Sequence, residues 1–347
     1  MSHSLLSDAF QMLRPLPATE AYRLATLKPM VLGFETTNVC NADCAFCAYG
    51  RMTRPKGTMS EGTFRSALGQ YTALGGGEIC FTPVVGDPLL DPDLVSRIRS
   101  ARAEKSIRAI ELFTNLIALD RAGGPGPLLG SGLTRIGVSL GGLDGKTYET
   151  LFRRERFAQV WENLERLLTE NVRGGHRVSV TVYVRALEAS PGPDGEARLR
   201  RLRDLGARVV HSARYDNWGG IVAQADLPGA ARFHAPKPFD GPCRELYKGL
   251  HVLWDGRVTA CGCRDVNGDP DLVLGDLARE PLDAIWRGVR LATLRERFAR
   301  DDRPSFCRAC LKYNGFLSTY GGPDGRRALR ANGRGLAPQR ARDAAPR

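Results

Sequence analysis

Short β-rich runs alternate with longer segments of helical periodicity between residues 30 and 216, and this alternation constrains the fold more than any other feature. Such alternation is typical of βα units that build a parallel sheet. The clearest helical segment carries apolar residues at one-face spacing from Phe157 to Leu168. Six units rather than eight predict an α/β fold, a partial (β/α)6 barrel of the TIM type. The expected strands begin at Met30, Glu78, Ala109, Arg135, Arg177 and Arg208.

The fifth expected strand has one apolar and one polar face. Its valines, from Val178 to Val184, alternate with Ser179, Thr181, Tyr183 and Arg185. We expect the valines to meet the helices and the polar side chains to point into an open barrel interior. A surface strand with one wet face would give the same pattern.

Composition and charge exclude several classes of protein. No apolar run approaches the roughly 20 residues that span a bilayer, and the N-terminus lacks the features of a signal peptide. We therefore expect a cytoplasmic protein without a membrane partner. In that compartment the nine cysteines indicate metal binding or catalysis rather than disulfides.

The net charge of +12 is concentrated at the C-terminus. Seven arginines and one aspartate follow from Arg326 onward, in a stretch rich in Gly, Pro and Ala. This composition predicts a disordered basic tail over 321–347. A metal-stapled nucleic-acid-binding protein is the alternative that the tail suggests, although we regard nucleic acid as an unlikely partner.

The pattern divides the chain into four parts. We expect a helical N-terminal extension over 1–29, a barrel over 30–220, a small cysteine-rich domain over 221–320 and the basic tail. Within the small domain the run from Leu250 to Cys263 predicts a hairpin that turns at Asp255 and Gly256. One helix-like stretch is expected from Leu282 to Phe298.

Three cysteines follow the first strand directly. Cys40, Cys44 and Cys47 are separated by three and then two residues, so their thiols must share one loop. That loop lies at the carboxyl end of the strand, where barrel enzymes keep their active sites. Three thiolates on a four-iron cluster leave one iron open to a substrate or cofactor. A zinc site is the alternative.

This spacing, with Phe46 before the last cysteine, resembles the radical S-adenosylmethionine (radical SAM) superfamily. The resemblance implies that Cys40, Cys44 and Cys47 hold a SAM-binding 4Fe–4S cluster and that Phe46 lies near the adenine. Reductive cleavage of SAM then gives a 5'-deoxyadenosyl radical, with an electron from a flavodoxin- or ferredoxin-type donor. Further positions that match the superfamily's cofactor-binding motifs, in chain order, are Gly86, Asp87, Thr114, Asn115, Ser139 and Arg185.

Several of these positions depart from the superfamily pattern. Asp87 replaces a glutamate, Leu116 replaces the glycine of a Thr-Asn-Gly element, and Gly141 replaces an aspartate. We therefore expect the amine of SAM to be contacted mainly by backbone near Gly86. Arg185 is placed to meet the carboxylate, because a guanidinium matches that group geometrically.

A second group of cysteines lies downstream, and its last two form a CxxC pair. Four such ligands bind either zinc or a fully ligated iron-sulfur cluster. The surrounding sequence resembles the shortened auxiliary-cluster domain called Twitch, a relative of SPASM. The resemblance implies an auxiliary 4Fe–4S cluster on Cys243, Cys261, Cys307 and Cys310.

Cys263 is left over from that assignment. It is the true ligand in place of Cys261, an inert thiol, or a catalytic hydrogen-atom donor to a substrate radical; the sequence leaves all three open. Cys80, in the second strand, is expected to be a small buried hydrophobic residue.

Enzymes with a single Twitch cluster resemble, as a group, those that modify aminocyclitols and sugars in antibiotic biosynthesis. The resemblance implies hydrogen abstraction from a carbinol carbon of a carbohydrate-like small molecule, leading to dehydrogenation, epimerisation or decarboxylation. A maturase of a ribosomal peptide is the alternative within the superfamily. Trp218 is expected to pack, and the substrate-facing candidates are His211, Arg214, Tyr215 and Asp216.

Overall fold

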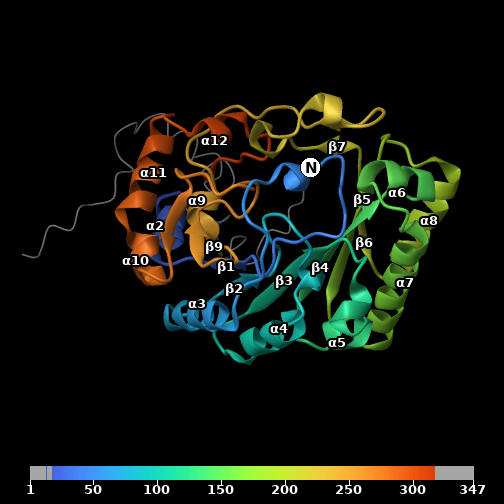
Figure 1. Cartoon of the computed structure of the whole chain (residues 1–347), viewed down its shortest axis with the longest axis horizontal. Helices are drawn as coiled ribbons and strands as arrows, with labels where there is room; N and C mark the ends of the chain where they lie inside the picture. Colours follow the sequence, from blue (N-terminus) through green and yellow to red (C-terminus); the bar gives the residue numbers. More distant parts are fainter. Residues whose placement is uncertain (1–12, 14–17, 317–347) are drawn as a thin grey trace, which may run out of the picture.

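The computed structural model describes residue 13 and residues 18–316. A single nine-stranded sheet organises them, in the order β11-β10-β9-β1-β2-β3-β4-β5-β6 (Figure 1). Neighbouring strands from β1 to β6 are parallel, as the βα alternation predicts. These six strands are β1 (Val31–Phe34), β2 (Glu78–Cys80), β3 (Ala109–Thr114), β4 (Arg135–Gly141), β5 (Ser179–Arg185) and β6 (Arg208–Ser212).

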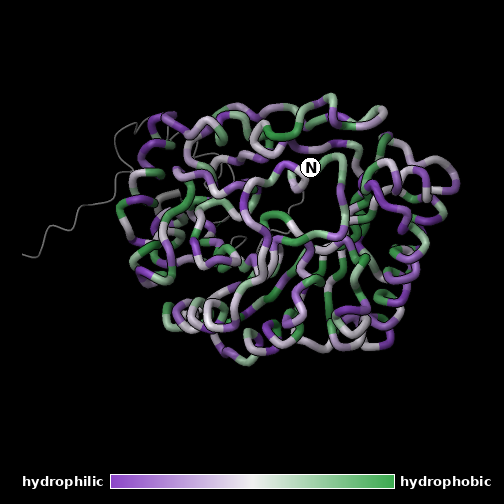
Figure 2. Tube along the Cα trace, viewed as in Figure 1, coloured by the Kyte–Doolittle hydropathy of each residue, from purple (hydrophilic) through white to green (hydrophobic). Residues whose placement is uncertain are grey.

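Helices cover the outer face of this curved sheet, and Figure 2 shows hydrophobic residues along the central strands and many hydrophilic ones on the peripheral helices. Side chains cap the N-termini of two of these helices. Ser60 accepts a hydrogen bond from the Thr63 backbone N–H, and Asp144 accepts one from the Thr147 backbone N–H. The helices between strands are α3 (Glu61–Ala73), α4 (Leu94–Ala103), α5 (Pro125–Leu129), α6 (Gly145–Phe152), α7 (Phe157–Arg173) and α8 (Gly192–Asp204).

Strand β5 has the two faces expected of it. Val180, Val182 and Val184 are buried in the core beneath the helices. Tyr183 and Arg185, on the opposite face, line a cavity inside the barrel. The partial barrel is therefore confirmed. Of the four polar side chains expected to face its interior, Tyr183 and Arg185 do so, whereas Ser179 is exposed and Thr181 is buried outside the cavity lining.

The downstream cysteine-rich segment continues the same sheet. Strand β9 (Gly249–Val252) pairs in parallel with β1, and β10 (Arg257–Thr259) pairs with it in antiparallel fashion. The expected hairpin is present, with Gly256 at φ 91° in its turn. Because β9 adds a seventh parallel strand, its side chains reach the barrel interior, which the sequence pattern did not predict. The remaining strands are β7 (Arg214–Tyr215), β8 (Arg232–Phe233) and β11 (Val273–Asp276).

The helix-like stretch expected from Leu282 to Phe298 is two helices rather than one. Gly288 has the extended dihedral angles φ −65° and ψ 158°, so the helix ends before it and a new one begins after it. Glycine loses more conformational freedom in a helix than other residues, which favours a break there. The helices of this part are α9 (Glu245–Lys248), α10 (Leu282–Arg287), α11 (Val289–Ala299) and α12 (Ser305–Ala309).

Within the N-terminal extension, helix α2 (Ala18–Leu27) is described and packs on the C-terminal segment. The ring of Tyr22 lies 5.4 Å from that of Tyr247, and Trp286 Nε1 donates to the Thr26 carbonyl. The basic tail lies outside the described residues. Over residues 18–316, none of the helices has the length and apolarity that a membrane crossing needs.

Candidate active site

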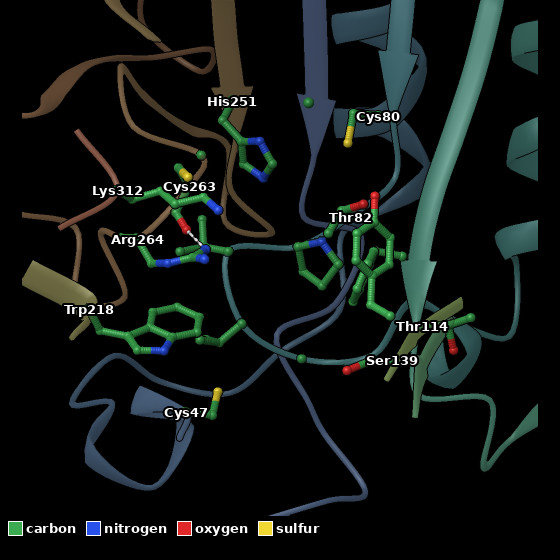
Figure 3. Close-up of a pocket in the computed structure, with 18 of the residues that line it drawn as sticks. Cys47, Cys80, Thr82, Thr114, Ser139, Trp218, His251, Cys263, Arg264 and Lys312 are labelled. Carbon is green, nitrogen blue, oxygen red and sulfur yellow. Dashed lines mark hydrogen bonds between the residues drawn. The ribbon is translucent and has the colours of Figure 1, made fainter. Parts of the chain in front are cut away.

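The carboxyl ends of the parallel strands surround a cavity of about 620 Å³. Its volume is within the range of small-molecule sites, roughly 300–1,000 Å³. In Figure 3, side chains of the C-terminal segment (Cys263, Arg264 and Lys312) face those of the barrel strands across it. Parallel strands direct their carboxyl ends to one edge of the sheet, so residues far apart in sequence meet here.

The thiols of Cys40, Cys44 and Cys47 all line this cavity. The loop is held by backbone hydrogen bonds from Asp43 and Ala45 to α6 and by the Tyr49 hydroxyl, which accepts from Cys40 N–H. Burial raises the pKa of Cys40 to about 12 and that of Cys47 to about 11.

Burial also raises the pKa of Cys44, and the charges of Cys47 and Cys40 raise it further, which indicates that the three thiols are close together. A positively charged metal centre would stabilise the thiolates that burial disfavours. Among the described residues, no three thiol, imidazole or carboxylate side chains converge on a single-ion geometry. The fit of an iron-sulfur cluster therefore rests on the shared cavity and on the thiol donors.

The turn after β2 contacts the cysteine loop. Gly86 has φ 118°, and a Cβ there would lie 2.9 Å from the Asn38 carbonyl carbon, so only glycine fits this approach. The Asp87 carboxylate accepts from Thr114 Oγ1, Asn115 N–H and Leu89 N–H, and burial raises its pKa to about 6. Asp87 thus ties the β2 turn to the end of β3.

Directly after β3, a non-glycine residue adopts a backbone conformation that glycine favours. Leu116 has φ 64°, the left-handed conformation that glycine adopts readily. Asn115 Nδ2 donates to Asn41 Oδ1 at 2.8 Å and lies 3.9 Å from Cys40 Sγ. Leu116 therefore adopts a backbone conformation that glycine favours, and Asn115 braces the cysteine loop.

Ser139 and Arg185 line the cavity from β4 and β5. The Arg185 guanidinium lies 5.7 Å from the Phe46 ring, and burial lowers its pKa. Its Nε is buried without a hydrogen-bond partner among the described residues. A buried guanidinium nitrogen without an acceptor fits a carboxylate ligand such as the one that SAM carries.

Phe46 lines the cavity and packs against Phe152 and Tyr215, with ring centroids 5.6 Å and 5.0 Å away. Its backbone carbonyl accepts a hydrogen bond from Trp218 Nε1 at 2.9 Å. The Phe46 ring is available at the cavity surface, and its contact with adenine stays a prediction.

The second group of cysteines comes together from separate segments. Burial raises the pKa of Cys243 to about 12 and that of Cys310 to about 11, and it also raises the pKa of Cys261 and Cys307. The charges of Cys307 and Cys310 contribute to the shift at Cys261, and those of Cys243 and Cys310 contribute at Cys307. These mutual effects show that the four thiols interact electrostatically, and their joint ligation of one cluster stays a prediction.

Cys263 differs from the other four downstream cysteines. Its charge raises the pKa of both Cys261 and Cys310, so it lies beside the group. It is nevertheless the one downstream cysteine among the residues that line the cavity.

Trp218 connects the two groups of cysteines. Its indole donates to Phe46 and stacks under the Arg264 guanidinium at 4.5 Å. Arg264 forms a bidentate ion pair with Asp216 at 2.6 Å and donates to the Cys263 carbonyl. Burial opposes ionisation of Asp216, but the Arg264 charge outweighs it and lowers the pKa of Asp216 to about 2. Trp218 therefore packs as expected, and its indole N–H also forms a hydrogen bond with the loop of the first cysteine group.

The four substrate-facing candidates divide equally. His211 and Arg214 line the cavity, and Tyr215 and Asp216 do not. The Tyr215 hydroxyl donates to the Ala186 carbonyl at 2.8 Å. Cys80 lines the cavity too, and burial raises its pKa to about 12.

Sequence reasoning missed the contribution of β9 and its flanking residues. His251 and Lys248 line the cavity beside β1, and Lys312 lines it close to the second cysteine group. A histidine within the apolar run Leu250 to Leu253 was the available signal. That histidine indicates a residue of the barrel wall only once β9 is known to pair with β1.

Two family models match the chain. Residues 34–187 match the radical SAM superfamily, and residues 243–311 match an iron-sulfur cluster-binding domain called SPASM. A GTP 3',8-cyclase from Edwardsiella ictaluri is 30% identical over 299 residues, covering 75% of this chain and 87% of that protein. Three further cyclases of that name, from Chlorobaculum tepidum, Synechococcus elongatus and Mannheimia succiniciproducens, align over only 39–42% of their own length.

Two solved structures share the fold. BtrN in complex with AdoMet and 2-DOIA has a TM-score of 0.53 and 18% identity, covering 83% of this chain and 95% of that chain. Streptococcus suis SuiB bound to its precursor peptide SuiA has a TM-score of 0.57 and 12% identity, covering 86% and 74%.

The family brings a SAM-binding 4Fe–4S cluster, an auxiliary cluster and SAM as cofactors. The cysteine loop after β1 and the open barrel agree with these matches. The chain therefore belongs to the radical SAM superfamily and carries a SPASM iron-sulfur domain after its barrel.

Proposed function

We propose that this enzyme abstracts a hydrogen atom from a carbinol carbon of a sugar, an aminocyclitol or a sugar-bearing nucleoside. Bound together, the cluster on Cys40, Cys44 and Cys47 and SAM supply a 5'-deoxyadenosyl radical, which takes the hydrogen atom and leaves 5'-deoxyadenosine. In this proposal Arg185 binds the SAM carboxylate, Phe46 lies against the adenine, and Gly86 presents backbone to the amine. Thr114, Asn115 and Ser139 complete the cofactor side of the cavity.

One observation carries the proposal: Cys263 lines the same cavity as Cys40, Cys44 and Cys47. A thiol S–H bond is weaker than most C–H bonds, so Cys263 can return a hydrogen atom to the carbon from the opposite side. The carbon is then inverted and Cys263 is left one electron oxidised. An electron from a ferredoxin- or flavodoxin-type donor, with a proton from water, restores the thiol.

Without hydrogen return the same carbinol radical would lose one electron and one proton and become a ketone. The auxiliary cluster, assigned to Cys243, Cys261, Cys307 and Cys310, is the electron acceptor for that outcome. If the neighbouring carbon carried a carboxylate, the radical would instead lose it as carbon dioxide and form an alkene, and the one electron released would pass to the auxiliary cluster. The position of Cys263 favours inversion over these two outcomes.

The substrate is small. A cavity of about 620 Å³ includes the SAM site, so cofactor and substrate share it. The named ligand of BtrN, 2-DOIA, and the GTP of the cyclases both offer ring carbons that bear hydroxyl groups. The proposal therefore covers carbohydrate-like substrates of both kinds, including antibiotic intermediates.

The peptide alternative finds less support in the described residues. Helix α2, the described part of the N-terminal extension, packs its Tyr22 against Tyr247 and its Thr26 carbonyl against Trp286. These contacts attach it to the C-terminal segment, on which it serves as a packing element rather than a separate binding domain.

The test is anaerobic incubation of cluster-loaded enzyme with dithionite, SAM and single candidate substrates, namely 2-DOIA, GTP and a precursor-type peptide. We expect a carbohydrate-like compound to raise 5'-deoxyadenosine formation at least tenfold. Stimulation by the peptide alone would contradict the proposal.

The role of Cys263 is tested by running the active substrate in deuterated water. An exchanged Cys263 thiol would deliver one deuterium to the inverted carbon, and Cys263→Ala would abolish this label. Unchanged turnover and stereochemistry in Cys263→Ala would remove Cys263 from the mechanism.

A further inference from the structure

His251 is one of the β9 residues that line the cavity in the barrel interior. It pairs in register with Gly33 of β1 on one side and Thr259 of β10 on the other. The imidazole is 6% exposed and lines the cavity. Figure 3 shows it projecting from the end of β9 toward the interior, on the side of Lys312 and Cys263.

Two glycines make room for this ring. A Cβ added at Gly33 would overlap with Nδ1 of His251, and a Cβ added at Gly262 would overlap with the same ring. Both glycines also line the cavity. Any other residue at either position would displace the imidazole, so the chain holds it in a slot between β1 and the loop that carries Cys263.

The Nε2 atom of His251 is buried and has no hydrogen-bond partner among the described residues. A buried polar atom without a hydrogen-bond partner destabilises a fold. Burial, together with the Arg54 and Lys248 charges, lowers the pKa of His251 to about 3, so the ring is neutral at physiological pH. A neutral imidazole offers one N–H donor and one lone pair.

A histidine that serves only to pack would have its ring nitrogens bonded, because otherwise an apolar side chain would fill the slot at lower free energy. The unpartnered nitrogen therefore points to a ligand that supplies the missing hydrogen bond. A hydroxyl group suits either tautomer, since it both donates and accepts.

We propose that His251 is a substrate-binding residue whose Nε2 forms a hydrogen bond with a substrate hydroxyl, on the side of the cavity that Cys263 lines. This inference rests on the proposed function and deepens it, because it places a hydroxyl-bearing face of the substrate beside the hydrogen donor. The slot formed by Gly33 and Gly262 fixes the direction of that hydrogen bond.

The test compares cluster-loaded wild type with His251→Leu by thermal unfolding and by steady-state kinetics with 2-DOIA and GTP as probes. We expect the unfolding midpoint to stay unchanged or rise by up to about 4 °C, because a buried unpartnered atom is removed. For the probe that the wild type turns over, KM should rise at least tenfold, with a smaller change in kcat.

A second variant reaches the same site without touching the histidine. Gly33→Ala should displace the imidazole and raise the same KM, whereas Gly69→Ala should not, since a Cβ at Gly69 meets nothing within 4 Å. His176→Asn, at an exposed position, is the control for loss of a histidine, because asparagine tolerates the left-handed backbone there (φ 54°).

A fall of the His251→Leu midpoint by more than about 4 °C, or a loss of iron, would overturn the inference by showing a structural histidine. An unchanged KM would overturn it as well. If the wild type turns over neither probe, the proposed substrate class fails, and the midpoint alone then decides the role of His251.

Discussion

The two groups of cysteines differ in how the chain assembles them. Cys40, Cys44 and Cys47 occupy one loop of eight residues, and all three thiols line the cavity. The five downstream cysteines come from three segments between residues 243 and 310, and among them only Cys263 lines the cavity. The first group therefore faces the cavity as a whole, whereas the downstream cysteines reach it through Cys263 alone.

Burial acts on both groups in the same direction, since it raises the pKa of Cys40, Cys44 and Cys47 as it does that of Cys243, Cys261, Cys307 and Cys310. The distinction between them is therefore one of access rather than of thiol acidity. A cluster that faces the cavity can bind SAM there, whereas a cluster outside the cavity wall can exchange only electrons with it. The following predictions test that division.

The largest effect is expected from Cys44→Ala. Loss of one of three ligands removes the SAM-binding cluster, so iron should fall from about eight to about four per chain. Formation of 5'-deoxyadenosine, measured by chromatography, should fall roughly 1,000-fold or more, because the catalytic centre is lost. If Cys44→Ala kept more than a tenth of the activity, the assignment of SAM binding to the first group of cysteines would be wrong.

Cys307→Ala should have the complementary effect. Iron again falls to about four per chain, but the remaining cluster is the one that binds SAM. Substrate turnover should drop roughly 100-fold, while the spectroscopic response of the remaining cluster to added SAM persists. Loss of that response would mean that the downstream group also supports SAM binding.

The pair Cys261→Ala and Cys263→Ala separates ligand from donor. If Cys261 is the ligand, its variant loses about four irons and the Cys263 variant keeps about eight. The reverse result would make Cys263 the ligand and would explain its closeness to Cys310. Iron and sulfide analysis of the reconstituted variants gives the answer.

Arg185→Gln tests the open side of the first group. The guanidinium has a buried nitrogen without a partner, and its removal should raise KM for SAM roughly 10- to 100-fold through loss of a charge-assisted hydrogen bond. Iron content should not change. An unaltered KM for SAM would assign the carboxylate to another residue.

The smallest effect is expected from Trp218→Phe, which removes the hydrogen bond to Phe46 between the two groups. The loss should be about 1 kcal/mol, lowering the unfolding midpoint by about 2–4 °C. Trp161→Phe, in the half-buried groove between α7 and α8, is the matched control. If both variants lowered the unfolding midpoint equally, the hydrogen bond from Trp218 to Phe46 would not be what connects the two groups of cysteines.

The first group could be read from sequence because its geometry is local. Spacing alone brings Cys40, Cys44 and Cys47 onto one loop, and alternation along β5 identified Arg185 as facing the interior. The roles of His251 and Lys312 could not be predicted, because they depend on β9 joining β1 and on the return of the chain after α12.

The amino-acid sequence by itself determined the parallel strands, the polar interior and the superfamily, since each depends on periodicity or spacing within a few dozen residues. Tertiary structure alone decided which thiol of the downstream group faces the cavity and which imidazole enters it. Those outcomes depend on packing across more than 200 residues, as in the contact of Gly33 with His251. No local pattern encodes a contact of that kind.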